Sequence, residues 1–383
     1  MEHNTGKNIL FVIPSLRGGG AERVLVNLLN IFNYKKYNVS LCVVNNEGIY
    51  FNEIPQEVEI KVLFQSPSIG RIFNKLYRSI GFCWLYKLLI YKRYNNRQFD
   101  VGIAFQDSSY ADLLFFFKAP ITKKISWVHS SYFTRKTYQK YKNQREKEKL
   151  IKRRYSKLDC LVFVSQDSKD SFVRMFGIPT NMEVCYNIID KDRIIAKSRE
   201  KFDCTFNHNV VNIIALGNLL EVKGYDKLIC ALSLLNKDGI EFHLRILGDG
   251  IMRKNLQRQI NTLKLNEKVS LMGFISNPYP ILKESDIFVM TSISEALPTA
   301  LIEAMIMGVA VAVTDCSGCN EIVGSGKFGL VAEQTVESIY YSLKEMICDK
   351  EKRNFYSNKS LIRAEIFNDK SVLAKVYSII GQL

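Results

Sequence analysis

The sequence has few residues of the kinds that build fibrous or disordered chains. Its 383 residues include only 8 Pro and 21 Gly. This composition excludes collagen-like repeats and long flexible linkers, and a hydrophobic fraction of 47% is that of a folded globular protein. Because the chain is more than twice the usual domain length of about 100 to 200 residues, we expect two domains.

The sequence also lacks an apolar run long enough to span a membrane. A spanning helix needs about 18 uncharged apolar residues. Lys87 and Lys92 interrupt the best candidate, and Glu303 interrupts the next. The apolar run 9–16 ends at Arg17 and is typical of a strand rather than of a signal peptide. We therefore expect a chain that is neither exported nor integral to a membrane.

The cysteines do not form a disulfide pattern. They are nine, an odd number, and they are scattered through the chain. Several lie in apolar runs such as 41–44, where cysteine behaves as a small buried hydrophobe. We expect no disulfide framework, which fits a reducing cytoplasm.

Acidic residues are scarce relative to basic ones. The 53 Lys and Arg against 38 Asp and Glu give a net charge of +15, which favours polyanionic partners such as nucleic acid, anionic lipid or a phosphorylated substrate. The segment 70–97 contains seven cations and no acid, interleaved with aromatic and aliphatic residues. This pattern predicts a basic amphipathic helix or helix pair at an anionic membrane surface. A crossover helix with snorkelling lysines is the alternative.

Short apolar runs alternate with helical patterns along the whole chain, which is typical of parallel strands with crossover helices. The predicted strands are 9–14, 39–44, 60–64, 101–105, 124–128, 160–164 and 183–186, then 211–216, 242–247, 269–272, 287–290 and 309–313. We expect two doubly wound α/β domains, 1–190 and 210–383, joined by a polar linker, 191–209. The last helix is expected to pack on the first domain. Ligands of such sheets bind at the carboxyl ends of the strands.

The loop after the first predicted strand is rich in glycine. Gly18, Gly19 and Gly20 precede a helical pattern. Glycines let the backbone approach a ligand, and a helix N-terminus offers unpaired N–H groups. The loop is therefore a candidate anion site, although three glycines are equally consistent with a tight turn.

Strand ends in the second half carry residues suited to a nucleotide sugar. Lys223 stands at a helix start, after the strand that ends near Asn218, and a cation there favours phosphate. Gly248 and Asp249 end the next strand in a turn that can approach a base or a ribose.

The segment 292–305 contains two glutamates with seven residues between them. Glu295 stands just before a helix that Pro298 opens, and Glu303 stands one to two turns inside it. Two carboxylates so placed can bind hydroxyls at both ends of a nucleotide sugar. The diphosphate between them can be received by the backbone amides of Leu297, Thr299 and Ala300.

Together these motifs resemble the retaining glycosyltransferases of family 4, whose GT-B fold has two Rossmann-like domains facing a central cleft. The resemblance covers nearly the whole chain. Residues 273–280 and 298–299 are similar to enzymes of bacterial capsule, O-antigen and related surface-glycan assembly. The carrying residues are the glycine loop 18–20, the strand-end His129, the stretch 217–224, the turn 248–250 and the two glutamates.

The resemblance implies a role for each residue. Glu303 would bind the ribose, Lys223 the diphosphate and Glu295 the transferred sugar, with His129 beside the sugar and acceptor. Glu295, His129 and Lys223 are therefore the catalytic candidates. The resemblance implies a nucleotide-sugar co-substrate and neither a metal nor another cofactor. The donor-binding candidates are Gly19, Gly20, Asn218, Lys223, Gly248, Asp249, Glu295, Leu297, Thr299, Ala300 and Glu303.

Two positions depart from the family pattern. Asn218 replaces the arginine that usually joins the lysine on the diphosphate, and Ala296 replaces a glycine. A nearby cation or helix end would then have to supply the missing charge. Asp190 and Asp192 have the spacing of a metal motif from another fold, but we interpret them as helix-capping acids.

From these features we expect an enzyme on the inner face of the plasma membrane. It would move a hexose or N-acetylhexosamine from a UDP-sugar to a growing lipid-linked glycan, with retention, and segment 70–97 would contact the anionic membrane. Two alternatives stay open. One is a sugar-nucleotide epimerase of the same fold, and the other is a basic nucleic-acid-binding protein. The sequence has no recognition-helix, zinc-finger or aromatic RNA-binding signature, so we expect no nucleic-acid partner.

Overall fold

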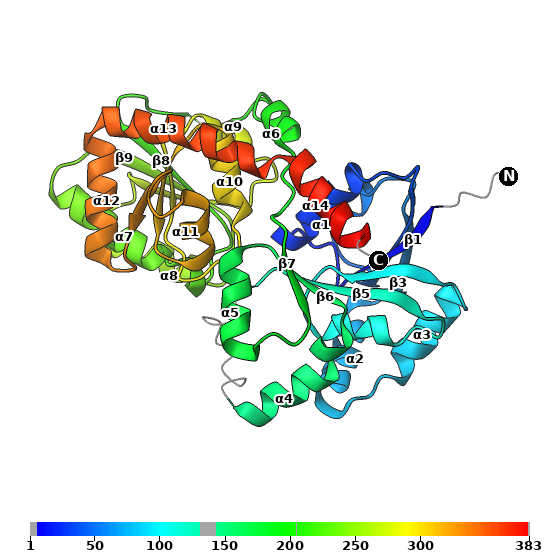
Figure 1. Ribbon diagram of the computed structural model, residues 1–383. Helices are drawn as coiled ribbons and strands as arrows, with labels where there is room; N and C mark the ends of the chain where they lie inside the picture. The colour runs from blue at the N-terminus through cyan, green and yellow to red at the C-terminus, as the bar shows by residue number, and fades with distance from the viewer. Residues whose placement is uncertain (1–5, 131–142, 204, 382–383) are drawn as a thin grey trace. The chain divides into compact units, whose positions relative to one another are not determined.

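The computed structural model describes residues 6–130, 143–203 and 205–381, which form two compact α/β units (Figure 1). Unit 1 contains the described residues of 1–188 and of 372–383. Unit 2 contains those of 189–371. The predicted class, two doubly wound parallel-sheet units, is confirmed.

Unit 1 is built on a parallel seven-stranded sheet of order β3-β2-β1-β4-β5-β6-β7. The central strand β1 is buried because both faces of the sheet are covered, so its run of Ile, Leu, Phe and Val needs no polar alternation. In register, Phe11 lies opposite Leu41 on one side and Ile103 on the other. The strands are β1 (Lys7–Ile13), β2 (Tyr37–Asn45), β3 (Glu59–Phe64), β4 (Phe99–Ala104), β5 (Ile121–Val128), β6 (Cys160–Phe163) and β7 (Asn181–Val184).

Helices connect these strands, and the last helix of the chain joins the same unit. In α14, Tyr377 stacks on Tyr37 with ring centroids 5.4 Å apart, and its hydroxyl accepts the N–H of Asn33 at 2.7 Å. Figure 1 shows α14 beside α1. The helices are α1 (Gly20–Asn30), α2 (Pro67–Ile80), α3 (Trp84–Tyr94), α4 (Gln144–Arg153), α5 (Gln166–Phe176) and α14 (Asp369–Gly381), with short turns η1 (Phe51–Glu53), η2 (Ser109–Phe115) and η4 (Tyr155–Lys157).

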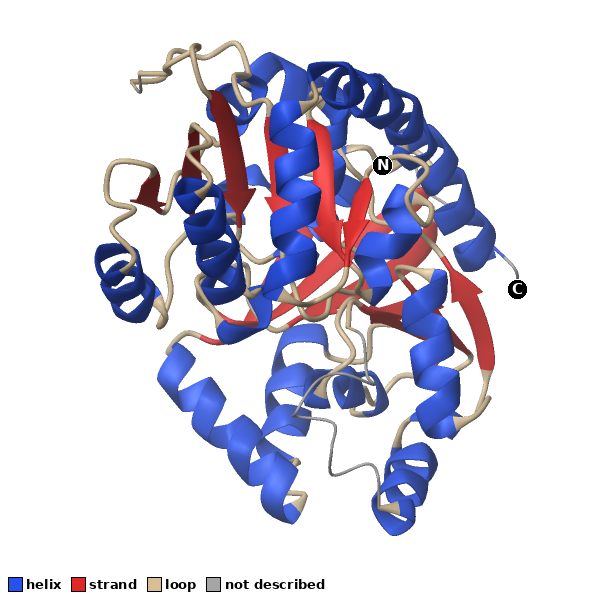
Figure 2. Ribbon diagram, turned by 90° about the vertical axis from the view of Figure 1, so that its left-hand side faces the viewer, coloured by secondary structure: helices blue, strands red, loops and turns tan. Residues whose placement is uncertain are grey.

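Unit 2 has a parallel six-stranded sheet of order β10-β9-β8-β11-β12-β13. Its strands are β8 (Val211–Leu216), β9 (Phe242–Leu247), β10 (Val269–Gly273), β11 (Ile287–Met290), β12 (Ala310–Thr314) and β13 (Leu330–Ala332). Its helices are α6 (Lys191–Lys197), α7 (Tyr225–Lys237), α8 (Arg253–Thr262), α9 (Tyr279–Lys283), α10 (Thr299–Ile306), α11 (Ser317–Val323), α12 (Val336–Cys348) and α13 (Lys350–Ala364), with turns η5 (Glu221–Lys223) and η6 (Glu365–Phe367). Figure 2 shows helices on both sides of the strands.

The structure differs from the sequence interpretation in two places. The predicted linker 191–209 begins with helix α6, because the Asp190 carboxylate caps it by accepting the N–H of Arg193 and because Ile194 is buried. Strand β13 was missed because it has three residues, too few to show a period. Within the described part of the chain, no helix is both long enough and apolar enough to cross a membrane.

Candidate functional site

Two predicted site residues of unit 2 meet directly. The Lys223 ammonium lies 2.6 Å from Glu295 Oε1, and the same oxygen accepts the hydroxyl of Ser292 at 2.7 Å. The lysine comes from η5 after β8, and the glutamate from the loop after β11, which is the neighbouring strand. Their side chains are 19% and 16% exposed, so the pair is partly screened from water but open to a ligand.

Hydrogen bonds from α11 fix the Glu295 loop. Ser317 Oγ donates to the Glu295 carbonyl at 2.9 Å, and the Gly318 N–H donates to it at 3.2 Å. A Cβ on Gly318 would lie 2.4 Å from the Ala296 carbonyl oxygen, so only glycine fits there. Ser292, Ser317 and Gly318 were missed from the sequence. Ser292 could have been found as the polar residue that follows a buried strand.

Glycines bring the loops after β8 and β9 close together. A Cβ on Gly248 would lie 2.1 Å from the Gly217 carbonyl oxygen, and both residues have φ near +145°. The Lys223 side chain passes over Gly217, with Nζ 3.5 Å from where a Cβ would stand. Asp249 folds back on its own loop, where its carboxylate accepts the Gly250 N–H. Asn218, at the position of the missing arginine, is exposed.

The start of α10 agrees with the sequence interpretation. Pro298 is the N-cap residue, and Thr299 and Ala300 are the first two helical residues, so their N–H groups have no carbonyl of their own helix to bond. The Leu297 side chain is buried and anchors the turn. Glu303 lies half-buried in the second turn.

In unit 1 the glycine loop holds a carboxylate of its own. Gly19 is the N-cap of α1, and Glu22 Oε2 occupies the space of a Gly19 side chain, 2.3 Å from an ideal Cβ. Burial raises the pKa of Glu22, opposed by hydrogen bonds from the N–H groups of Glu22 and Gly19 and by the charge of Arg17. Around Gly20 there is open space. Glu22 was missed, although an acid three residues after an N-cap is the signal of a capping box.

His129 follows β5, as expected, and packs on Phe105 with ring centroids 5.0 Å apart. Its Nε2 is buried and, among the described residues, has no hydrogen-bond partner. Burial lowers the pKa of His129 to about 3, so the ring is neutral at pH 7. A neutral imidazole with an unused nitrogen can accept or donate a hydrogen bond to a substrate hydroxyl.

The buried histidine predicts a specific pH dependence. Below its ordinary pKa of 6.5 the unfolded chain binds a proton at His129, whereas the folded chain binds it only near pH 3. The free energy of unfolding therefore decreases as the pH is lowered from about 6.5 toward 3. Between pH 7 and pH 5 the wild type should lose about 2 kcal/mol more than His129→Asn. Urea unfolding followed by tryptophan emission measures this, because Trp84 and Trp127 both lie in unit 1. Parallel pH profiles in the two proteins would show that His129 titrates normally.

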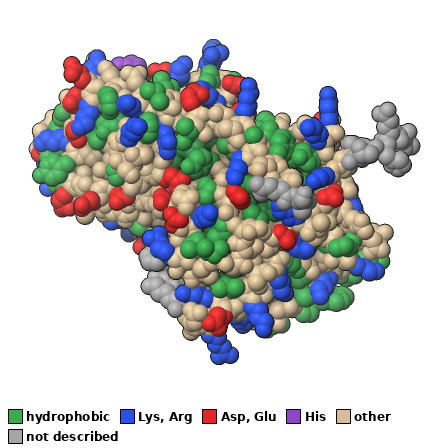
Figure 3. Space-filling view, in the orientation of Figure 1, with side chains coloured by type: hydrophobic (Ala, Val, Ile, Leu, Met, Phe, Trp, Pro, Cys, Tyr) green, Lys and Arg blue, Asp and Glu red, His purple; other side chains and the backbone are tan. Residues whose placement is uncertain are grey.

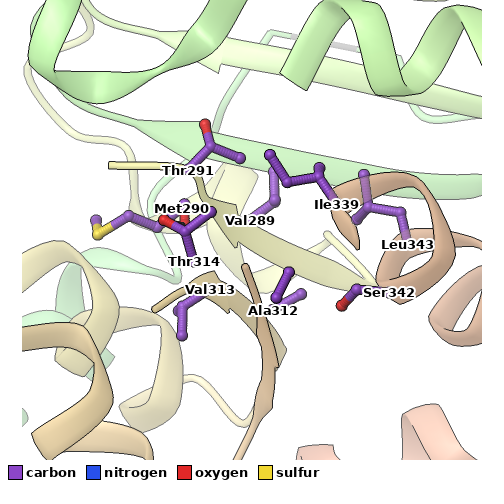
Figure 4. Close-up of a pocket in the computed structure, with 10 residues that line it drawn as sticks. Val289, Met290, Thr291, Ala312, Val313, Thr314, Ile339, Ser342 and Leu343 are labelled. Carbon is purple, nitrogen blue, oxygen red and sulfur yellow. Dashed lines mark hydrogen bonds between the residues drawn. The ribbon is translucent and has the colours of Figure 1, made fainter. Parts of the chain in front are cut away.

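A small cavity lies between β11, β12 and α12 of unit 2 (Figure 4). Its volume of about 10 Å³ is room for one water at most. Ser342 Oγ borders the cavity, is buried and has no partner among the described residues. The cavity therefore suits a structural water and is far too small for a nucleotide.

The two acids with metal-motif spacing lie at the start of a helix. Asp190 caps α6 and Asp192 lies in its first turn. Among the residues that the structure describes, no three His, Cys, Asp or Glu side chains gather as a metal site would require.

Comparison with known proteins identifies both halves of the chain. Residues 18–193 match the family model described as Glycosyltransferase Family 4, and residues 196–361 match the model described as Glycosyl transferases group 1. A Campylobacter jejuni protein is 30% identical over 95% of this chain and 96% of its own length. It is named N-acetylgalactosamine-N,N'-diacetylbacillosaminyl-diphospho-undecaprenol 4-alpha-N-acetylgalactosaminyltransferase.

Solved structures show the same fold at low sequence identity. Anabaena Alr3699/HepE in complex with UDP has a TM-score of 0.74 at 18% identity, covering 98% of this chain and 100% of its own. Sucrose-phosphate synthase from Thermosynechococcus elongatus has a TM-score of 0.80 at 13% identity, covering 98% of both chains.

Proposed function

This chain belongs to glycosyltransferase family 4, and from that premise we propose that it transfers a hexose or N-acetylhexosamine from a UDP-sugar to a lipid-linked glycan, with retention at the anomeric carbon. The observation that carries the proposal is the Lys223–Glu295 pair at the strand ends of unit 2. Support for UDP comes from the UDP complex of Alr3699/HepE, and support for the acceptor comes from the name of the Campylobacter relative.

The chain's own charges suit a departing diphosphate. A lysine ammonium has three N–H donors, so Lys223 can keep its bond to Glu295 and still donate to a phosphate oxygen. The free N–H groups of Thr299 and Ala300 at the start of α10 are a second positive pole. As the bond to the sugar breaks, negative charge grows on the diphosphate, and these fixed groups stabilise it. We propose that they act without a metal ion.

Glu295 and Glu303 divide the rest of the donor between them in this proposal. Glu295, oriented by Lys223 and Ser292, accepts hydroxyls of the transferred sugar. Glu303, one turn further into α10, accepts the ribose hydroxyls. His129 accepts or donates at the sugar and acceptor through its unused Nε2, and the acceptor hydroxyl attacks the face from which UDP leaves.

Glu303→Ala should weaken UDP binding, because the ribose hydroxyls lose a charged acceptor. The expected rise in Kd is about 10- to 100-fold, or about 1.5 to 3 kcal/mol. Calorimetric titration with UDP measures it, and Glu351→Ala is the control because Glu351 is an exposed acid in the first turn of α13. An unchanged Kd for UDP would remove Glu303 from the donor site.

Transfer itself is tested with a panel of UDP-sugars and a polyprenyl-diphosphate-linked glycan, in buffer with and without EDTA. The proposal expects an extended glycan with retained anomeric configuration and a rate that EDTA leaves unchanged. An epimerase would instead interconvert UDP-sugars with no acceptor present. A nucleic-acid-binding protein would bind duplex DNA with a steep salt dependence and leave UDP-sugars intact.

A lipid-linked acceptor requires the enzyme to work at a membrane surface, and we propose the cytoplasmic face, with contact through segment 70–97. In this segment α2 and α3 expose large apolar side chains, gathered at the lower right of the face that Figure 3 shows. Such a patch is unusual on a surface that meets only water. The most exposed are Ile72, Ile80 and Trp84, at 59%, 73% and 62%.

The cations of the same segment do not all point outward. Arg93 donates to the carbonyl of Val62 and so serves the packing of α3, whereas Lys87 is exposed and lies 5.9 Å from the ring centroid of Phe116. Lys75 and Lys92 are exposed and form no ion pair with a described residue. The predicted basic amphipathic helix pair therefore has cations with different roles. Exposed apolar residues carry more of the proposed contact than charge does.

Changing Ile72, Ile80 and Trp84 together to Asn should reduce binding to phosphatidylcholine–phosphatidylglycerol vesicles by about tenfold or more, because apolar burial in the interface is lost. Sedimentation measures the loss. In the wild type the emission of Trp84 should also shift to the blue on binding, while Trp127, buried beside Phe105, stays unchanged. Ile178→Asn is the control, since Ile178 is 76% exposed elsewhere on unit 1. A wild type that ignores anionic vesicles at low salt would contradict the membrane proposal.

A further inference from the structure

Helix α2 presents two different exposed stripes. The apolar stripe is Ile69, Ile72, Leu76 and Ile80, and the cationic stripe is Arg71, Lys75 and Arg78. At 100° per residue, the centres of the two stripes are turned about 140° apart. The buried side, with Gly70 and Tyr77, lies between them on the inner face. When the apolar stripe faces a membrane, the cationic stripe therefore faces away from it.

The cationic stripe turns instead toward the carboxyl ends of the strands. Gly70 packs so tightly against the end of β2 that a Cβ would lie 1.8 Å from Asn45 Oδ1. Next to it, Arg71 donates to Glu47 Oε2 at 3.0 Å. The same oxygen accepts Arg17, from the loop after β1, at 2.5 Å. Two guanidinium groups thus share one carboxylate oxygen at the ends of two neighbouring strands.

A third arginine joins them around Tyr110, which lies in η2 after β4. Ser109 of η2 donates to Asn74 Oδ1 of α2 at 2.8 Å, so η2 packs against this helix. Burial raises the pKa of Tyr110, and a hydrogen bond with Asn45 and the charges of Arg17, Arg71 and Arg78 oppose the rise. Arg78 forms no ion pair within the described part of the chain. Against these three cations stand the carboxylates of Glu47 and of Glu22, on which the charge of Arg17 also acts, so positive charge is in excess at this edge of the unit 1 sheet.

We propose that Arg17, Arg71 and Arg78, with the hydroxyl of Tyr110, bind the diphosphate of the lipid-linked acceptor. The inference rests on the proposed function and adds the site in unit 1 that recognises its acceptor. A diphosphate diester has two negative charges, which the excess of positive charge attracts, and guanidinium groups bind phosphate oxygens in pairs of N–H bonds. The lipid chain can pass around the exposed side of α2, across the angle of about 140° between the two stripes, to reach the apolar stripe and Trp84.

Glu47 gives the proposal a consequence that damage to the fold cannot imitate. Its carboxylate neutralises Arg17 and Arg71 in the free protein, and those arginines hold the pKa of Glu47 below its usual range. An incoming diphosphate must compete with it. Glu47→Gln should therefore bind a diphosphate more tightly than the wild type, whereas loss of an arginine should weaken binding.

The probe is farnesyl diphosphate, titrated calorimetrically in saturating UDP so that the donor site is filled. Wild type should bind saturably, and Arg71→Gln/Arg78→Gln should bind about tenfold or more weakly. Glu47→Gln should bind at least about threefold more tightly. Lys36→Gln is the matched control, because Lys36 is exposed just before β2, at the opposite edge of the same sheet, and should leave the Kd unchanged.

Competitors separate the possible sources of binding. Inorganic pyrophosphate should displace farnesyl diphosphate, and farnesol should not. If farnesol binds as well as its diphosphate, the surface recognises only the lipid chain and the inference is overturned. If the arginine variant keeps the wild-type Kd, the arginines do not bind the diphosphate and the inference is overturned as well. Unchanged near-ultraviolet circular dichroism shows that unit 1 of each variant is folded. Failure to bind UDP or to turn over any UDP-sugar would instead contradict the proposed function, independently of the arginine cluster.

Discussion

Lys223→Ala is expected to lower kcat by about 100- to 1,000-fold, the loss typical of removing one fixed group that stabilises charge in a transition state. The Kd for UDP should rise by less than about tenfold, because UDP in the ground state gains less from the lysine than the departing diphosphate does. The loss in kcat should be near the upper end, about 1,000-fold, since the residue at position 218 is asparagine and supplies no second cation beside Lys223.

The measurement is a pair of assays on one protein, turnover of the UDP-sugar that the wild type uses and calorimetric binding of UDP. Lys237→Ala is the matched control, because Lys237 is an exposed lysine in the last turn of α7 in the same unit. Equal losses in kcat and in UDP affinity would show that Lys223 binds the ground state and the transition state alike. No loss in either would place the diphosphate elsewhere.

Much of this arrangement is predictable from local patterns. Each apolar run overlaps one of the strands β1 to β12. The inner strands are apolar throughout because both of their faces are covered. The start of α10 is predictable because proline fixes the first turn of a helix. Lys223 and Glu295 were both expected near helix starts, but 71 residues stand between them. Their 2.6 Å contact follows from the adjacency of β8 and β11, which is a property of topology.

Other features could not be obtained from sequence because they depend on which faces meet. The cations of 70–97 appear as one group along the chain, yet Arg93 bonds a strand carbonyl while Arg71 bonds Glu47 at a strand end. A helical period gives the stripes of α2, but not which stripe faces the sheet edge. Likewise Glu22 has the spacing of a capping acid, but the position of its carboxylate against Gly19 is seen only in the folded loop.

Unit 1 also contains a buried network of charged side chains that no sequence motif predicts. Arg154, 4% exposed, donates to Asp112 at 2.5 Å and to Asp107 at 3.3 Å. Tyr155 donates to Asp107 at 2.9 Å, and Tyr77 of α2 donates to Asp112 at 2.6 Å. One guanidinium thus balances two buried carboxylates and connects α2, η2 and η4. The orientation of both stripes of α2 depends on this network.

Arg154→Met is accordingly expected to lower the free energy of unfolding of unit 1 by about 3 to 5 kcal/mol, because it leaves Asp107 buried without a cation and leaves Asp112 only the partly exposed Arg153. Urea unfolding followed by tryptophan emission reports this unit, which contains both tryptophans. Arg153→Met is the matched control. Its guanidinium reaches the same Asp112 at 3.5 Å but is 41% exposed, so its loss should cost under about 1 kcal/mol.

The pH dependence of the Arg154→Met defect identifies its cause. Burial already raises the pKa of Asp107, and Arg154 opposes that rise, so removing the arginine raises the folded-state pKa further. A carboxylate whose pKa is higher folded than unfolded favours folding as pH falls, because the folded state then binds the proton more tightly. The deficit of the variant should therefore be smaller at pH 5 than at pH 8, and adding Asp107→Asn should recover part of it at pH 8. A deficit that is constant with pH and insensitive to Asp107→Asn would mean that lost packing, and not the uncompensated charge, destabilises the variant.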